Sequence, residues 1–76
     1  MQHMFFHLRD GPEYIEDPEG HAFLHIDAAR VEATESLREI LADRLRTGTR
    51  TGGLQVEICD AGGHLLTVVP ARSVLG

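Results

Sequence analysis

Hydrophobic residues follow a strand-like pattern in the first third of the chain. Residues 4–9 are mostly apolar and aromatic on both faces, and the turn signal Asp-Gly-Pro follows at 10–12. This pattern predicts a strand that enters a hairpin. Residues 13–17 are the predicted return strand, and Asp-Pro-Glu-Gly at 17–20 fits a type I turn. Residues 21–24 either pair briefly with a strand or lead across to the next element.

A four-residue period predicts one amphipathic helix over about residues 28–47. Acidic residues lie between the repeating apolar positions, and Ile40 lies beside the repeat. The repeating positions are Ala29, Ala33, Leu37, Leu41 and Leu45. Asp27 is the expected N-cap, and Gly48 can take the left-handed conformation that ends a helix. One stripe of this helix is therefore expected to face a core.

The last third of the chain reads as a second hairpin. Residues 54–59 alternate apolar and polar, residues 60–63 supply a glycine-containing turn, and residues 64–69 return as a strand that Pro70 stops. Two hairpins joined by a helix predict an α+β fold, a two-layer β-β-α-β-β arrangement with the helix on one face of a four-stranded antiparallel sheet. We expect the strand order 2-1-3-4 and a single domain over residues 1–76.

The sheet face that the helix does not cover is the candidate interaction surface. If the alternation holds, its residues are Phe5, His7, Tyr14, Cys59, Leu65 and Val69. A monomer does not normally leave so much apolar surface in water, so we expect a homodimer formed by sheet stacking or by pairing of an edge strand. The alternative is that residues 71–75 fold back and cover this face.

Composition narrows the classes of partner. The chain has 12 acidic and 7 basic residues, and its net charge of −5 together with the absence of lysine disfavours nucleic-acid binding. No apolar run approaches the ~18 residues needed to cross a bilayer, and the first residues lack a signal-peptide pattern. We therefore expect a cytoplasmic protein with no membrane partner. The single cysteine, Cys59, excludes an internal disulfide.

The histidines and the cysteine raise two kinds of site chemistry, metal binding and nucleophilic catalysis. The chain has five histidines but no metal-ligand signature, so ordinary hydrogen-bonded histidines are the favoured interpretation. If a metal site exists, its expected ligands are His21, His25, Asp17 and Glu19. A nucleophilic pair of Cys59 and His7 needs a third orienting group and a dry pocket, which a bare sheet face does not supply. We therefore expect no cofactor and no enzymatic activity.

Several segments together resemble a known family. They are Phe-Phe-His-Leu-Arg-Asp-Gly at 5–11, Asp-Pro-Glu-Gly at 17–20, Asp-Ala-Ala-Arg at 27–30 and the hairpin that begins with Val-Glu-Ile-Cys-Asp at 56–60. The set resembles a family of small, stand-alone bacterial domains of unknown function, over nearly the whole chain. This resemblance implies an aromatic strand, an acidic turn, an amphipathic helix and a final hairpin, and it implies no activity.

A second similarity concerns architecture alone. Strands followed by an amphipathic helix are similar to the small α+β domain of certain antitoxins, which neutralise an RNA-cleaving toxin. Three functional hypotheses result. The first is a non-enzymatic interaction or regulatory module that acts as a homodimer. The second is an antitoxin-like acidic partner of a small basic protein, and the third is a metal-binding protein.

Overall fold

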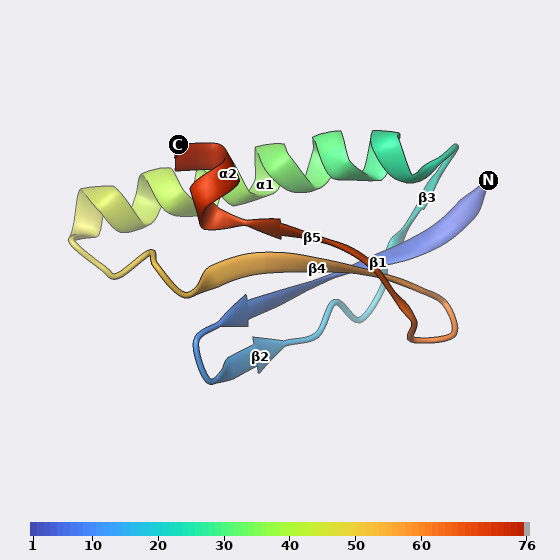
Figure 1. The fold of residues 1–76 in the computed structure, drawn as a ribbon, viewed down its shortest axis with the longest axis horizontal. Helices are drawn as coiled ribbons and strands as arrows, with labels where there is room; N and C mark the ends of the chain where they lie inside the picture. The colour runs from blue at the N-terminus through green and yellow to red at the C-terminus, as the bar shows by residue number, and fades with distance from the viewer. Residues whose placement is uncertain (76) are drawn as a thin grey trace.

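The computed structural model describes residues 1–75, which form an antiparallel sheet with helices on one of its faces (Figure 1). The elements are β1 (Gln2–Asp10), β2 (Glu13–Ile15), β3 (His21–Phe23), α1 (Ile26–Thr47), β4 (Leu54–Asp60), β5 (Leu65–Pro70) and α2 (Ala71–Leu75). In Figure 1, α1 runs along one side of the sheet and α2 lies next to it. The predicted α+β class and its two-layer arrangement are confirmed.

The sheet contains the predicted strand order and one additional strand. The order is β2-β1-β4-β5, which is the order expected for two hairpins paired through their first strands. β2 pairs with residues 8–10 of β1, whereas β3 pairs with residues 2–4. Residues 5–7 of β1 therefore lie between two short partners on that side. The four-strand prediction left residues 21–24 as either a briefly paired segment or a connection, and the structure shows that residues 21–23 pair with β1.

The core lies between α1 and the sheet. Four helix residues at successive four-residue steps are buried, and they are Ala29, Ala33, Leu37 and Leu41. They pack with a sheet and C-terminal cluster that comprises Met4, Leu54, Val56, Ile58, Val69 and Ala71. The prediction that Leu45 continues the buried stripe is wrong, because 63% of this residue is exposed. Each four-residue step turns a helix by about 40° beyond a full circle, so the fifth position has rotated away from the sheet.

The helix begins earlier than predicted. His25 is the N-cap, and its Nδ1 accepts the backbone N–H of Ala28 at 3.2 Å. Asp27, the predicted cap, instead lies in the first turn, where a negative charge is favourable to the helix dipole. The C-terminal prediction is confirmed, because Gly48 has φ +77° and ends the helix in the left-handed conformation.

A register shift in the second hairpin changes which side chains of β5 face the core. Cys59 pairs with Leu65 but the preceding Ile58 pairs with Thr67, so β5 contains one extra residue at this point. The bulge reverses the alternation, and Val69 pairs with Val56 and is 5% exposed in the core. Its predicted place on the uncovered face is therefore wrong.

The C-terminal segment does not cover the uncovered face either. Residues 71–75 form α2, which contacts α1, and its Ala71 and Val74 pack with the helix-side core. The alternative in which this segment folds across the other sheet face is wrong. The Ala71 and Val74 side chains of α2 pack against the hydrophobic layer that α1 and the sheet form, and this contact buries them on the helix side.

Within 1–75, neither helix combines the length and the apolar character that crossing a bilayer requires.

Candidate functional site on the open sheet face

The sheet face opposite α1, here called the open face, contains the side chains of residues 3, 5, 7 and 9 of β1 and of residues 55, 57 and 59 of β4. A row of rings follows β1. His3 and Phe5 meet edge to face with ring centroids 5.1 Å apart, and Phe5 stacks with His7 at 6.2 Å. The His7 ring lies 5.6 Å from the Tyr14 ring of β2, and the guanidinium of Arg9 lies 4.5 Å above Tyr14. The structure thus brings the predicted residues Phe5, His7 and Tyr14 together.

A polar cluster lies beside these rings. The Nε of Arg9 pairs with Oε2 of Glu57 at 2.6 Å, and Nε2 of Gln55 donates to the same oxygen at 3.0 Å. The hydrogen bond from Arg9 lowers the pKa of Glu57, against an opposite effect of partial burial. The open face is therefore mixed in polarity, more so than the alternating sequence pattern predicted.

Asp17 is the organising residue of the loop between β2 and β3, which lies beside residues 5–7 of β1. Its Oδ2 accepts the backbone N–H of Phe6 at 3.1 Å, where β1 has no strand partner on that side. Its Oδ1 accepts the backbone N–H groups of Glu19 and Gly20, at 3.2 and 3.1 Å. Partial burial tends to raise the pKa of Asp17, but these three backbone donors outweigh it and the pKa is lowered. The carboxylate completes both a turn and a sheet ladder.

Two histidines of β1 attach the same loop to the sheet. The backbone N–H of Asp17 donates to Nδ1 of His7 at 3.1 Å, so this nitrogen is unprotonated in the structure. The Nε2 of His3 lies 2.8 Å from the carbonyl oxygen of Glu19, and it is the donor because a carbonyl only accepts. The rings therefore position the loop rather than project into solvent as free bases.

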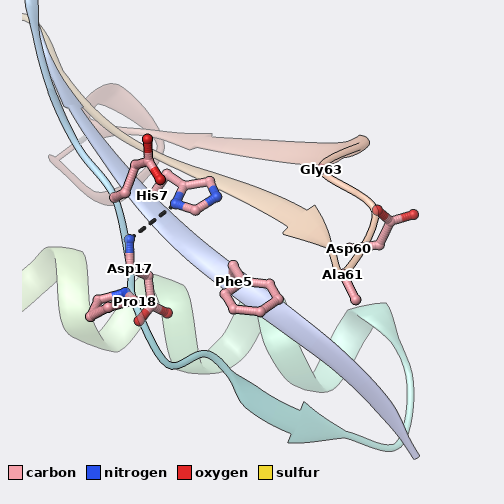
Figure 2. A pocket seen from close by; sticks show the side chains of 8 residues that line it. Phe5, His7, Asp17, Pro18, Asp60, Ala61 and Gly63 are labelled. Atoms are coloured by element: carbon pink, nitrogen blue, oxygen red, sulfur yellow. Dashed lines mark hydrogen bonds between the residues drawn. The ribbon is translucent and has the colours of Figure 1, made fainter.

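A shallow hollow opens between this loop and the turn of the second hairpin. Its cavity volume is about 300 Å³, and Figure 2 shows the Phe5 ring between Pro18 on one side and Ala61 on the other. Three carboxylates contribute to its lining, from Glu16, Asp17 and Asp60. Oδ1 of Asp60 accepts the backbone N–H groups of Gly62 and His64, each at 2.9 Å. Two of the three carboxylates thus take part in turn formation.

Cys59 lies on the open face opposite Phe5 in the β1–β4 pairing. It is 6% exposed, and burial raises the pKa of its thiol, helped by the nearby charge of Glu57. A thiol in this state is protonated near neutral pH and is a poor nucleophile. His7 lies opposite Glu57 rather than opposite Cys59, and its Nδ1 is engaged by the loop. The remaining predicted interface residue, Leu65, pairs with Cys59 and is 57% exposed.

The hypothesised metal ligands have separate structural roles. His25 caps α1 through Nδ1, and His21 lies in β3, where it pairs with Met4. Both carboxylate oxygens of Asp17 accept backbone N–H groups. In the part of the chain that the structure describes, no three or more His, Cys, Asp or Glu side chains are grouped so that they would hold a metal ion.

Three features of this face were not predicted. The Arg9–Glu57 pair joins residues 48 positions apart, and no local pattern indicates such a contact. The hydrogen bond from the Phe6 N–H to Asp17 could not be predicted from the sequence either, although the Asp-Pro-Glu-Gly sequence did indicate a turn. Gly20 is buried against β1, since a Cβ there would lie 2.7 Å from the carbonyl oxygen of Met4. A glycine in a turn sequence predicts a positive φ, here +67°, but it does not predict this close approach to β1.

Comparison with known proteins assigns the chain to a family. A family model described as Domain of unknown function (DUF6894) matches residues 3–72. The chain belongs to this family. The DUF6894 match includes β2 to β5 and every open-face residue described above, so the predicted resemblance to a domain of unknown function is confirmed. No curated protein and no solved structure matches the chain.

Proposed function

We propose that this protein is a non-enzymatic interaction module that acts in the cytoplasm as a homodimer. The observation that carries the proposal is the exposure of large apolar side chains on the two outer strands of the sheet. They are Tyr14 and Ile15 on β2, and Leu65 and Leu66 on β5. Apolar side chains grouped along sheet edges are typical of surfaces that another polypeptide covers.

The roles of the polar side chains on the open face support a non-enzymatic function. Asp17 closes a turn, His7 accepts a backbone N–H and Glu57 pairs with Arg9. Catalytic acids and bases instead need a lone pair or proton directed at a substrate. The raised pKa of the Cys59 thiol also supports a non-enzymatic function, because a protonated thiol is a poor nucleophile.

A second candidate is an antitoxin-like acidic partner of a small basic protein. The acidic lining of the hollow, from Glu16, Asp17 and Asp60, favours it, as does the net charge of −5. A neighbouring reading frame that encodes a short basic protein distinguishes this candidate from the homodimeric module, because an antitoxin is normally produced beside its toxin.

Native mass spectrometry of untagged protein, purified without chelator, tests the proposed function. We expect a dimer mass with no added metal, and a dimer fraction that falls on dilution. A monomer mass at every concentration contradicts the homodimer. A mass increase that corresponds to a bound metal ion, lost in a double variant of His21 and His25, contradicts the proposal in favour of a metal-binding protein.

A further inference from the structure

The sheet has one long free edge. Among residues 1–75, β5 pairs only with β4, and its outer side has no strand partner. β5 has six residues, whereas β2 and β3, on the opposite side of the sheet, have three each. A free edge presents unpaired backbone N–H and C=O groups, and the length of β5 makes it the larger template for another strand.

The chemistry of this edge differs from that of β2. Natural edge strands are protected from pairing with other chains by shortness, charged residues, proline or β-bulges. β2 is short and contains Glu13, whereas β5, with the sequence Leu-Leu-Thr-Val-Val-Pro, contains no charged residue. In a protein of net charge −5, an uncharged strip is where a second copy can approach with the least electrostatic repulsion. Of the two sides of the sheet, the β5 edge is therefore the one that suits a second copy of this chain.

Pro70 indicates which backbone groups of β5 point outward. Proline has no N–H, and within sheets it is found on edge strands with its nitrogen side facing solvent. Pro70 pairs with Gln55, and Val68, two residues earlier, pairs with Glu57 without an intervening register shift. Orientation repeats every second residue in an antiparallel ladder, so the N–H and C=O of Val68 also point away from β4.

Two features limit the extent of pairing. The bulge at Leu66 interrupts the regular ladder toward the hairpin turn. At the other end, the Oγ of Ser73 donates to the carbonyl oxygen of Pro70 at 2.7 Å, and α2 begins. Regular strand is therefore available over residues 67–70, where Val68 is the outward-pointing residue that has an N–H.

We propose that two copies of this chain associate by antiparallel pairing of their β5 edges, with Val68 at the two-fold axis. The two Val68 residues exchange both N–H···O bonds, and the two sheets become one continuous sheet. The exposed Leu66 then lies beside the neighbouring strand. This inference rests on the proposed homodimer and specifies its interface. Because the paired edge is short, the dimer dissociates within the concentration range of ordinary sedimentation experiments.

Val68→Pro is the most direct test. It removes the outward N–H and leaves the β4–β5 ladder bonds in place, so it is expected to prevent pairing while the monomer still folds. Leu66→Lys is the second variant, since it adds a charge at an exposed edge position that is 40% accessible. Val31→Lys, on α1 and 66% exposed, is the matched control, because it adds the same charge at an exposed apolar position away from the sheet edges.

Sedimentation velocity over a wide concentration range measures the dissociation constant, and circular dichroism reports folding. We expect both β5 variants to raise the dissociation constant at least about tenfold, and Val31→Lys to leave it unchanged. Folded β5 variants that dimerise like the wild type overturn the β5 interface and leave the homodimer intact. A wild type that is monomeric throughout overturns both proposals. If Val68→Pro fails to fold, Leu66→Lys decides between these outcomes.

Discussion

The carboxylate of Asp17 accepts the backbone N–H of Phe6 at 3.1 Å, in the gap between the two short strands that pair with β1. A side chain here takes the place of a strand. The N–H of Phe6 is part-buried and has no strand partner, and a buried backbone N–H without a partner costs about as much free energy as a lost hydrogen bond. Asp17 is thus part of the sheet although it lies in a loop.

We expect Asp17→Asn to lower the free energy of unfolding by about 1–3 kcal/mol, because an amide keeps only one oxygen for three backbone donors and loses the charge. Urea unfolding followed by circular dichroism measures this difference. Glu16→Gln, at the neighbouring exposed position, is the control and should change stability by less than about 0.5 kcal/mol. Equal effects of the two substitutions would show that the carboxylate bonds contribute nothing specific.

The contribution of Asp17 should depend on pH. Its folded-state pKa is lowered, so the folded protein binds this proton less readily than the unfolded chain does. The stabilisation is then fully present above the unfolded value of about 3.9 and is lost as the pH falls through the folded value. We expect the stability gap between wild type and Asp17→Asn to be constant near pH 6 and to narrow below about pH 4. A gap that stays the same down to pH 2 contradicts the lowered pKa.

Gly20 and Gly48 separate backbone strain from packing. Both have positive φ, +67° and +77°, so an alanine at either position is strained by about 1–2 kcal/mol. A Cβ at Gly20 also meets the carbonyl oxygen of Met4 at 2.7 Å, whereas nothing lies within 4 Å at Gly48. Thermal unfolding should therefore show that Gly20→Ala lowers the free energy of unfolding by about 1–3 kcal/mol more than Gly48→Ala does. Similar losses would argue against the close approach of the loop to β1.

Leu41 and Leu45 test the face of the helix. Leu41 is 1% exposed, so Leu41→Ala should cost about 2–5 kcal/mol through lost burial and the cavity it leaves. Leu45 is exposed, and Leu45→Ala should change stability by less than about 0.5 kcal/mol. Chemical denaturation of the two variants provides the comparison. A large loss for Leu45→Ala would show that another surface, such as a second copy, covers this residue.

The reactivity of Cys59 offers a check on the absence of nucleophilic chemistry. Burial raises the pKa of its thiol, so alkylation by iodoacetamide at pH 8 should be far slower in the folded protein than in the same protein in urea. Mass spectrometry of the alkylated chain follows both rates. Faster reaction in the folded state would indicate an activated thiolate and would revive the pairing with His7.

Several elements were predictable because their signals are local. Four-residue spacing located α1, period-two spacing located β4, and glycines located the turns at 48 and 63. The order of the elements then left few ways to arrange two hairpins and one helix. The strand order and the face that α1 covers followed from these constraints.

Other features depended on contacts between distant residues. The helix cap is a local contact that was also not predicted, because Nδ1 of His25 accepts the N–H of Ala28 although Asp27 is the more usual capping residue type. Val69 faces the core because a one-residue bulge in β5 reverses its side, and alternation alone cannot indicate an inserted residue. Alternation indicated that Phe5 and His7 share a face, but the Arg9–Glu57 pair on that face was not visible in the sequence.

The sequence by itself determined the main helix, the two hairpins, the class of fold and the acidic, single-cysteine composition that narrows the classes of function. These properties depend on spacing and composition, which are fixed along the chain. Only the tertiary structure decided that the carboxylate of Asp17 completes β1, that α2 packs on the helix side and that β5 remains a free, uncharged edge. Each of these depends on which distant segments meet, because a hydrogen bond or a buried contact forms only where the folded chain brings both partners within reach.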